Sequence, residues 1–138
     1  MNVTQAASRS VGDRVIHKAF APITRHTLAL YCGASGDHNP IHVDLDFAKK
    51  AGFPDVFTHG MLVMAYLGQA LTDAVRPKDI RAFSTRFAAI TQLGARLTCE
   101  GHVTELIDHN GEPCMKIALV AKDGAGEAKL LGEAIVAR

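Results

Sequence analysis

Two different spacings of hydrophobic positions divide this chain into a mainly helical first half and a strand-rich second half. Residues 60–72 carry no charge, and apolar side chains would fall on every side of the helix that this run predicts. A helix that is apolar all round has to be enclosed by other structure, so we expect it to be buried. The run is also too short to cross a bilayer, which takes about 20 apolar residues.

Shorter elements are predicted ahead of this helix. Residues 14–20 form a candidate first strand, and Thr24 can cap a short helix that follows it. Asp44 can cap a second short helix that stops at Gly52. Two glycines, an Asp, an Asn and a Pro fall within residues 33–40, which predicts a loop between the two helices.

Beyond Pro77 the spacing changes to alternation with a period of two, which is typical of strands. Turn signals at Asn110-Gly111 and Asp123-Gly124 separate the later strands. Consecutive strands with short turns predict an antiparallel sheet, and together with the buried helix they predict an α+β domain whose sheet curls around the helix. The edge strands of such a sheet could pair two copies into a dimer. The alternating segments are residues 83–89, 97–104, 115–122 and 130–137.

Composition narrows the class of protein. A chain of 138 residues suits one domain over 1–138, in which we expect residues 1–10 to be a loose lead-in. Hydrophobic residues make up 48% and charged residues 21%, which excludes a disordered chain. Fifteen basic against 14 acidic residues give no general attraction for polyanions, so no nucleic-acid partner is expected.

Cysteine usage and the N-terminus both favour a cytoplasmic protein. Cys32, Cys99 and Cys114 are odd in number and form no CxxC pair, so neither a disulfide framework nor a zinc site is predicted. Residues 1–12 contain one Arg and no apolar run, which is unlike a signal peptide. We therefore expect reduced, buried thiols and no membrane association.

Polar chemistry concentrates around Asp37 and His42, which lie five residues apart across the Asn39-Pro40 break. A carboxylate beside an imidazole can hold and activate a water molecule. Composition alone favours the plainer interpretation, in which Asp37 caps a turn and His42 is a satisfied surface histidine.

The second feature is Thr58-His59-Gly60-Met61, directly before the buried helix. A helix N-terminus presents unpaired N–H groups, and a glycine there allows a substrate oxygen to approach the backbone closely. Such an N–H could stabilise an oxyanion. Spacing alone also fits an ordinary helix start capped by Thr58 or His59.

Taken together, these residues resemble the hydratase 2 motif of MaoC-like dehydratases, a family that includes (R)-specific enoyl-CoA hydratases. The resemblance rests on Tyr31 with Ser35-Gly36-Asp37-x-Asn39-Pro40-Ile41-His42 and on the downstream His59-Gly60-Met61, and it covers residues 11–138. It implies a hot-dog fold, in which a curved antiparallel sheet wraps around one long central helix. It also implies a homodimer or a dimer of dimers, and a role in fatty acid metabolism.

The resemblance implies a catalytic pair, Asp37 and His42, with Asn39 orienting the pair or its loop. The reaction would be the (R)-specific hydration of a trans-2-enoyl thioester to an (R)-3-hydroxyacyl thioester, or the reverse dehydration. Asp37 would take a proton from water and His42 would give one to C2 of the substrate. No metal or redox cofactor is implied, since coenzyme A or acyl carrier protein is the carrier on the substrate.

The same resemblance implies an oxyanion and substrate-binding group made of Gly60, His59 and Met61. The Gly60 N–H would hold the developing enolate, His59 would buttress the loop, and Met61 would line the core or the acyl tunnel. In some hydratases of the family, a serine on the central helix supports the catalytic pair. This chain departs from that pattern, because it has Gly68 at the corresponding position. His38 is expected to face solvent, because no other ligand lies at metal-binding spacing.

Two alternatives stand beside the hydratase interpretation. A hot-dog acyl-thioesterase would need a carboxylate on the central helix, yet the run contains no Asp or Glu before Asp73. A non-catalytic, acyl-thioester-binding partner subunit is the other alternative. The intact Asp37 and His42 pair argues against it. Acyl chain length and carrier are not determined by the sequence.

Overall fold

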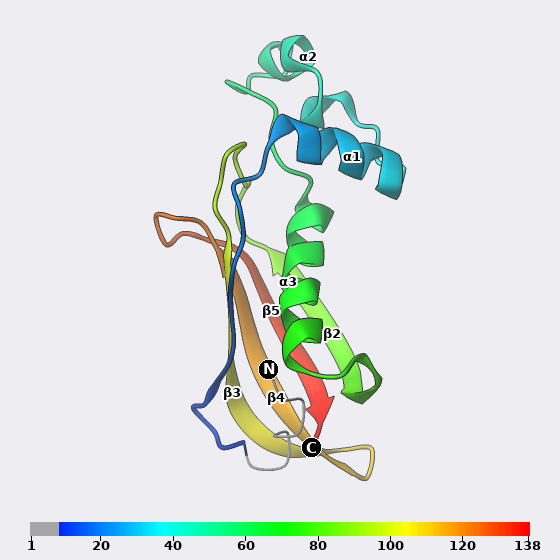
Figure 1. The fold of residues 1–138 in the computed structure, drawn as a ribbon, viewed down its shortest axis with the longest axis vertical. Coiled ribbons are helices and arrows are strands. Elements are labelled where there is room, and N and C mark those ends of the chain that lie inside the picture. Colours follow the sequence, from blue (N-terminus) through cyan, green and yellow to red (C-terminus); the bar gives the residue numbers. More distant parts are fainter. Residues whose placement is uncertain (1–8) are drawn as a thin grey trace.

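The fold is a curved five-stranded antiparallel sheet with one long helix lying along its concave face (Figure 1). The computed structural model describes residues 9–138. The central helix is α3 (Gly60–Ala74), and the expected hot-dog arrangement of an α+β domain is confirmed. The expected lead-in falls mostly on residues 1–8, outside the described residues. In sheet order, the strands are β1 (Arg14–Ala19), β3 (Thr98–His109), β4 (Glu112–Lys122), β5 (Ala128–Ala137) and β2 (Ile80–Phe87).

The core lies between α3 and the sheet. Leu67 and Leu71 of α3 are almost fully buried, as are Ile117 and Leu130, which lie on the central strands. Burying side chains of this size is the main favourable term in folding, at about 1.5–3 kcal/mol each. The later strands therefore present one apolar face to α3, as their alternating pattern predicted.

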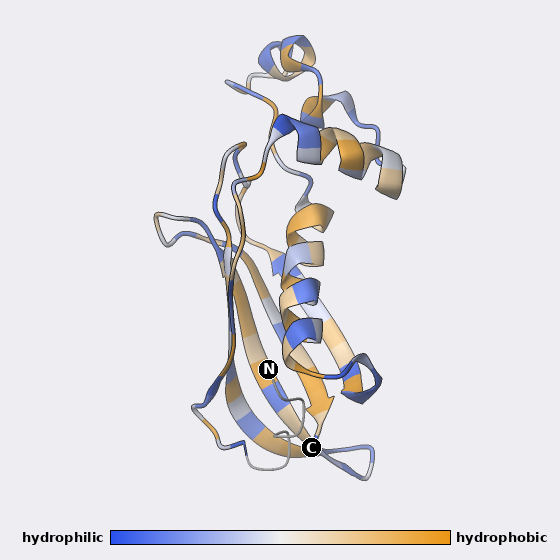
Figure 2. Cartoon of the chain, viewed as in Figure 1, coloured by the Kyte–Doolittle hydropathy of each residue, from blue (hydrophilic) through white to orange (hydrophobic). Residues whose placement is uncertain are grey.

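Enclosure of α3 is incomplete in the single chain, which corrects the expectation that the sheet curls all the way around it. Met61 is 53% exposed, and Ala65 and Gln69 are also exposed, so no element within residues 9–138 covers this side of the helix. Figure 2 shows polar residues in the second half of α3. This side of α3 is left uncovered because one curved sheet can cover only the side of a helix that it faces.

Strand order differs from a simple succession of neighbouring strands. Strands β3, β4 and β5 do pair in sequence order, but β2 pairs with β5 at one edge, while β1 pairs with β3 at the other. Residues 88–97 connect β2 to β3 along the chain and cross one end of the sheet. Main-chain bonds hold this crossing segment, from Thr58 N–H to the Thr91 carbonyl at 2.9 Å and from Phe20 N–H to the Leu97 carbonyl at 2.9 Å. Alternation identifies strands but does not identify their partners.

Two short helices lie together beyond the start of α3 (Figure 1). Helix α1 (Arg25–Ser35) is capped by Thr24, and α2 (Leu45–Lys50) is capped by Asp44, as predicted. The predicted loop over 33–40 is too long, since α1 continues to Ser35. Gly36 ends it in the left-handed conformation at φ 75°, with its N–H bonded to the Cys32 carbonyl, a conformation that glycine adopts at little cost.

The turn between β3 and β4 is confirmed at Asn110-Gly111, where φ is 51° and 83°. Two successive positive φ values are those of a type I′ turn, whose twist matches a two-stranded hairpin. Within residues 9–138, no helix combines the length and the apolar character needed to cross a membrane.

Candidate active site

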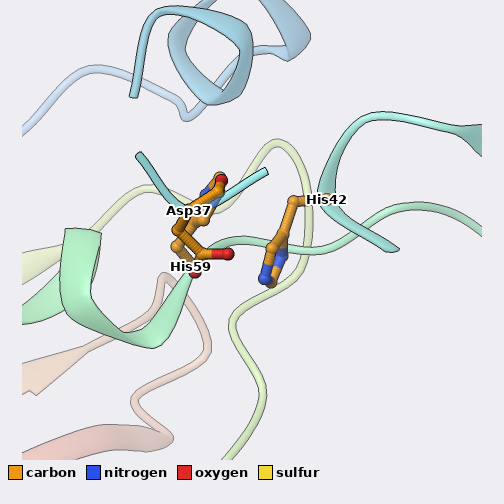
Figure 3. Close-up of side chains that lie close together, drawn as sticks. All are labelled: Asp37, His42 and His59. Atoms are coloured by element: carbon orange, nitrogen blue, oxygen red, sulfur yellow. The ribbon is translucent and has the colours of Figure 1, made fainter. Parts of the chain in front are cut away.

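Three side chains from separate segments meet at the start of α3. Asp37 comes from the loop after α1, and His42 comes from the one-turn helix η2 (Pro40–His42). His59 immediately precedes α3. Each offers an oxygen or nitrogen atom that lies within 4.8 Å of the others, and Figure 3 shows the three side by side. The structure thus brings together the predicted pair and one further predicted residue.

Hydrogen bonds within the loop explain how Asp37 and His42 come to face each other. The Asp37 N–H donates to Ser35 Oγ at 3.1 Å, and Asp37 Oδ1 accepts from the Asn39 N–H at 3.2 Å. Asn39 has φ −56° and ψ 120°, outside the helical region as expected before proline, and its Oδ1 accepts from the Ile41 N–H at 3.1 Å. Asp37 therefore does cap a turn, and the same turn carries the chain on to His42.

His42 is buried, with 8% of its surface exposed, so the alternative of a surface histidine is wrong. Its Nδ1 lies 2.7 Å from the Phe57 carbonyl oxygen. A carbonyl only accepts, so Nδ1 carries a hydrogen and donates it, and Nε2 is the ring nitrogen left to exchange a proton. The main chain thereby determines which nitrogen of His42 is free for chemistry.

His59 is the most buried member of the group, with 1% of its surface exposed. Its ring stacks on that of His42, with centroids 3.8 Å apart and planes inclined by 27°. Its Nε2 lies 3.3 Å from the main-chain oxygen of Asp37 and 3.4 Å from Cys32 Sγ. Burial, followed by the nearby His42, lowers the pKa of His59 below its ordinary value of 6.5.

The start of α3 carries no side-chain cap. His59 occupies the N-cap position without a capping hydrogen bond, and Thr58 Oγ1 is buried without a hydrogen-bond partner in the part of the chain that the structure describes. The alternative of a helix start capped by either side chain is therefore wrong. The first N–H groups of α3 are left without side-chain acceptors, and Gly60 is exposed beside them. This arrangement can bind an oxygen atom that carries negative charge.

A cavity of about 340 Å³ opens next to Gly60. Its walls include Val63 in the first turn of α3, Phe87 at the end of β2, and residues 88–91 of the crossing segment. The cavity is lined mainly by apolar groups, which suits an acyl or pantetheine chain. Phe57 also lines it, and through its carbonyl this residue connects the cavity to His42.

The remaining predicted residues lie around this group. The Asn39 side chain accepts from the Ile41 N–H within its own loop, Met61 is half-exposed on the open side of α3, and His38 is exposed as expected. A Cβ at Gly68 would lie 3.5 Å from the Phe83 ring, an ordinary contact, so a small side chain such as serine would fit there.

Sequence reasoning missed two contributors. Phe57 acts through a main-chain carbonyl, for which a sequence pattern carries no signal. Phe87 faces Gly60, where a Cβ would meet its ring at 3.0 Å. The one sequence signal for a role of Phe87 was its position near the end of the alternating segment 83–89.

The three groups are spaced closely enough to suggest a metal site, but the ring geometry is unsuitable. Imidazole lone pairs lie in the ring plane, and stacked rings direct them side by side instead of toward one ion. Cys32 Sγ and the Asp37 carbonyl also occupy the His59 Nε2 direction.

The sequence of this chain is similar to those of known proteins. A family model described as "MaoC like domain" matches residues 6–125. The enoyl-CoA hydratase ChsH3 of Mycobacterium tuberculosis is 37% identical over 73 residues, which cover 51% of this chain and 26% of that protein. The chain spans about a quarter of the length of the first curated relatives that it matches.

Two solved structures share the fold over nearly the whole chain. The R-hydratase PhaJ1 of Pseudomonas aeruginosa has a TM-score of 0.82 and 29% identity, covering 95% of this chain and 83% of that one. The (R)-hydratase of A. caviae, described as involved in PHA biosynthesis, has a TM-score of 0.82 and 25% identity, covering 96% and 98%.

Proposed function

Because this chain belongs to the MaoC-like dehydratase family, we propose that it catalyses the (R)-specific hydration of trans-2-enoyl thioesters, or the reverse dehydration of (R)-3-hydroxyacyl thioesters. Relatives are named enoyl-CoA hydratase and 3-hydroxyacyl-thioester dehydratase, which are hydro-lyases. The single observation that carries the proposal is the approach of Asp37 to His42, within 4.8 Å, directly before the uncapped N-terminus of α3.

In this proposal a water molecule sits between the Asp37 carboxylate and His42 Nε2. Asp37 takes a proton from the water as its oxygen forms a bond to C3 of the substrate. The electron pair of the C2–C3 double bond moves toward the thioester oxygen, and protonated His42 then gives its Nε2 proton to C2. Transfer of the proton from Asp37 to His42 restores the resting pair, and dehydration follows the same steps in reverse.

The thioester oxygen is held at the start of α3. The Gly60 N–H donates to it while charge develops, and an added Cβ would crowd the Phe87 ring at this point. Removing such a donor typically costs about 10²–10³ in kcat. The apolar cavity beside Gly60 takes part of the acyl-carrier chain, and exposed Met61 borders the same end of α3.

We also propose that the working form is a homodimer or a dimer of dimers in the cytoplasm. The uncovered side of α3 and the edge strands β1 and β2 are the surfaces that a second copy could cover. The proposed steps use only protein groups, with coenzyme A or acyl carrier protein as the substrate carrier. Full activity is therefore expected in the presence of a chelator, and sedimentation should give a mass of at least two chains.

The test is the loss of enoyl-thioester absorbance when purified protein is added to crotonyl-CoA. Asp37→Asn and His42→Ala should both reduce kcat by at least about 10²-fold, since each removes one partner of the proton transfer. His38→Gln is the matched control, because His38 is exposed in the same loop and should leave the rate unchanged. Chiral analysis of the product should give the (R) alcohol.

Other outcomes point to the alternatives. Release of free thiol without hydration would establish the acyl-thioesterase, although the helix carboxylate Asp73 is paired with Lys18 near the far end of α3. Binding of the thioester without turnover, including with longer and carrier-linked substrates, would establish a non-catalytic subunit. Formation of the (S) alcohol would refute the proposed stereochemistry alone.

A further inference from the structure

His59 contacts both members of the catalytic pair, and it does so in two different ways. Its Nε2 lies 3.3 Å from the main-chain oxygen of Asp37, and its ring lies face to face with His42 at 3.8 Å. We propose that His59 is a positioning residue, which as a neutral imidazole holds the Asp37 backbone and the His42 ring in a fixed relation. This inference rests on the function proposed above.

The hydrogen-bond partners determine the tautomer of His59. The Asp37 carbonyl oxygen can only accept, so Nε2 carries the hydrogen and donates it. Cys32 Sγ, at 3.4 Å on the last turn of α1, lies close to the same nitrogen. His59 therefore links three segments at a single atom: the end of α1, the Asp37 loop and the start of α3.

The other ring nitrogen explains why His59 stays neutral. Nδ1 is buried and has no hydrogen-bond partner among the described residues. A proton there would add a buried donor without an acceptor and a charge stacked on His42. The groups facing the ring are Asp37, His42, Tyr31 and Cys32. Of these, the Asp37 carboxylate favours a charge on His59, but burial opposes it more strongly.

Each ring of the stacked pair is held by a main-chain carbonyl. His42 Nδ1–H donates to the Phe57 carbonyl at 2.7 Å, and His59 Nε2–H donates to the Asp37 carbonyl at 3.3 Å. The two rings also form the centre of an aromatic column. Tyr31 packs edge-on against His59 at 4.8 Å, and Phe57 packs edge-on against His42 at 5.2 Å. The column prevents either imidazole from turning without displacing its neighbours.

Hydrogen bonds hold Asp37 through both its main-chain N–H and its main-chain carbonyl. Its N–H donates to Ser35 Oγ at 3.1 Å, and its carbonyl accepts from His59. Asp37 is exposed, and its carboxylate is also held by the Asn39 N–H. The bond from His59 attaches the Asp37 main chain to a buried side chain, and it thereby helps to set the distance of the carboxylate from His42. Loss of this bond should misplace the carboxylate, and a shift of about 1 Å can cost about 10²-fold in rate.

The test compares His59→Gln with His59→Met. The two side chains have similar length and volume, but only the Gln amide keeps an N–H near the position of Nε2. We expect His59→Met to lower kcat about 10²-fold with KM changed less than about threefold, and His59→Gln to stay within about tenfold of wild type. Equal kcat values for the two variants, with unchanged thermal unfolding, would overturn the proposal.

A second measurement covers the case in which a variant does not fold. Imidazole ¹⁵N NMR on the wild-type protein should show His59 as the neutral Nε2–H tautomer at the pH of maximal activity. A cationic His59 at the pH of maximal activity, or an Nδ1–H tautomer, would also overturn the proposal. His38→Gln serves as the control for assignment and activity, because His38 is exposed beside Asp37.

The two proposals fail in distinguishable ways. Wild-type protein that hydrates no enoyl thioester refutes the function, whereas the NMR result still decides the tautomer and the stack. Normal wild-type hydration with equal His59→Gln and His59→Met rates refutes the positioning role alone.

Discussion

Gly60→Ala tests the close approach of substrate to the start of α3. An added Cβ would lie 3.0 Å from Cε1 and 3.1 Å from Cδ1 of Phe87. Carbon atoms in favourable contact are about 3.5–4.0 Å apart, so the ring and the methyl group would have to separate by about 0.5–1 Å. Phe87 is 53% exposed and ends β2, so its ring can turn. The folded state should therefore lose at most about 1 kcal/mol.

Catalysis should suffer more than stability. Gly60 and Phe87 line the same cavity, so both the methyl group and the displaced ring would occupy space beside the Gly60 N–H. If the thioester oxygen is pushed away by about 1 Å, the expected loss in kcat is about 10²-fold. That loss corresponds to about 2.7 kcal/mol in transition-state stabilisation.

The assay is crotonyl-CoA hydration together with thermal unfolding. Gly33→Ala is the matched control, because a Cβ there has nothing within 4 Å and Gly33 lies within α1. The control should gain up to about 1 kcal/mol in helix stability and keep its activity. Wild-type kcat in Gly60→Ala, with both variants folded, would refute the idea that substrate approaches the backbone at Gly60.

Three further predictions concern stability and reactivity. Burial lowers the pKa of His59, so the unfolded chain binds more protons below about pH 6.5 and the free energy of unfolding should fall as the pH drops. Denaturant titrations at about pH 7.5 and about pH 5 should show a smaller fall for His59→Gln, and equal falls would contradict this. In Gly132→Ala, a Cβ would lie 2.8 Å from the Ser84 carbonyl oxygen of the paired strand β2, so we expect a loss of about 1–3 kcal/mol by urea unfolding, with Gly124→Ala as control. Burial raises the pKa of Cys99 to about 12, so iodoacetamide should label it only after unfolding, as peptide mass mapping can check.

Local patterns in the sequence were sufficient for most of the helices and strands. The uncharged run predicted α3, and alternation with turn signals predicted β3, β4 and β5. The caps at Thr24 and Asp44 were also correct. These features depend on residues a few positions apart, so the order of the residues states them directly.

Predictions about partners over longer distances were less complete. Alternation along β2 could not show that it pairs with β5, and the apolar character of α3 could not show which of its sides stays uncovered. Each depends on how the crossing segment 88–97 runs over the end of the sheet, and no local pattern encodes that path.

The same division applies within the site. The sequence alone placed Asp37 and His42 in one loop and His59 directly before a helix, and the motif resemblance gave them an expected reaction. Only the tertiary structure decided that His59 stacks on His42 and donates to the Asp37 carbonyl, and that the Phe57 carbonyl orients His42. Stacking and main-chain hydrogen bonds join atoms that are distant along the chain, and main-chain atoms are the same in every residue, so they leave no trace in the sequence.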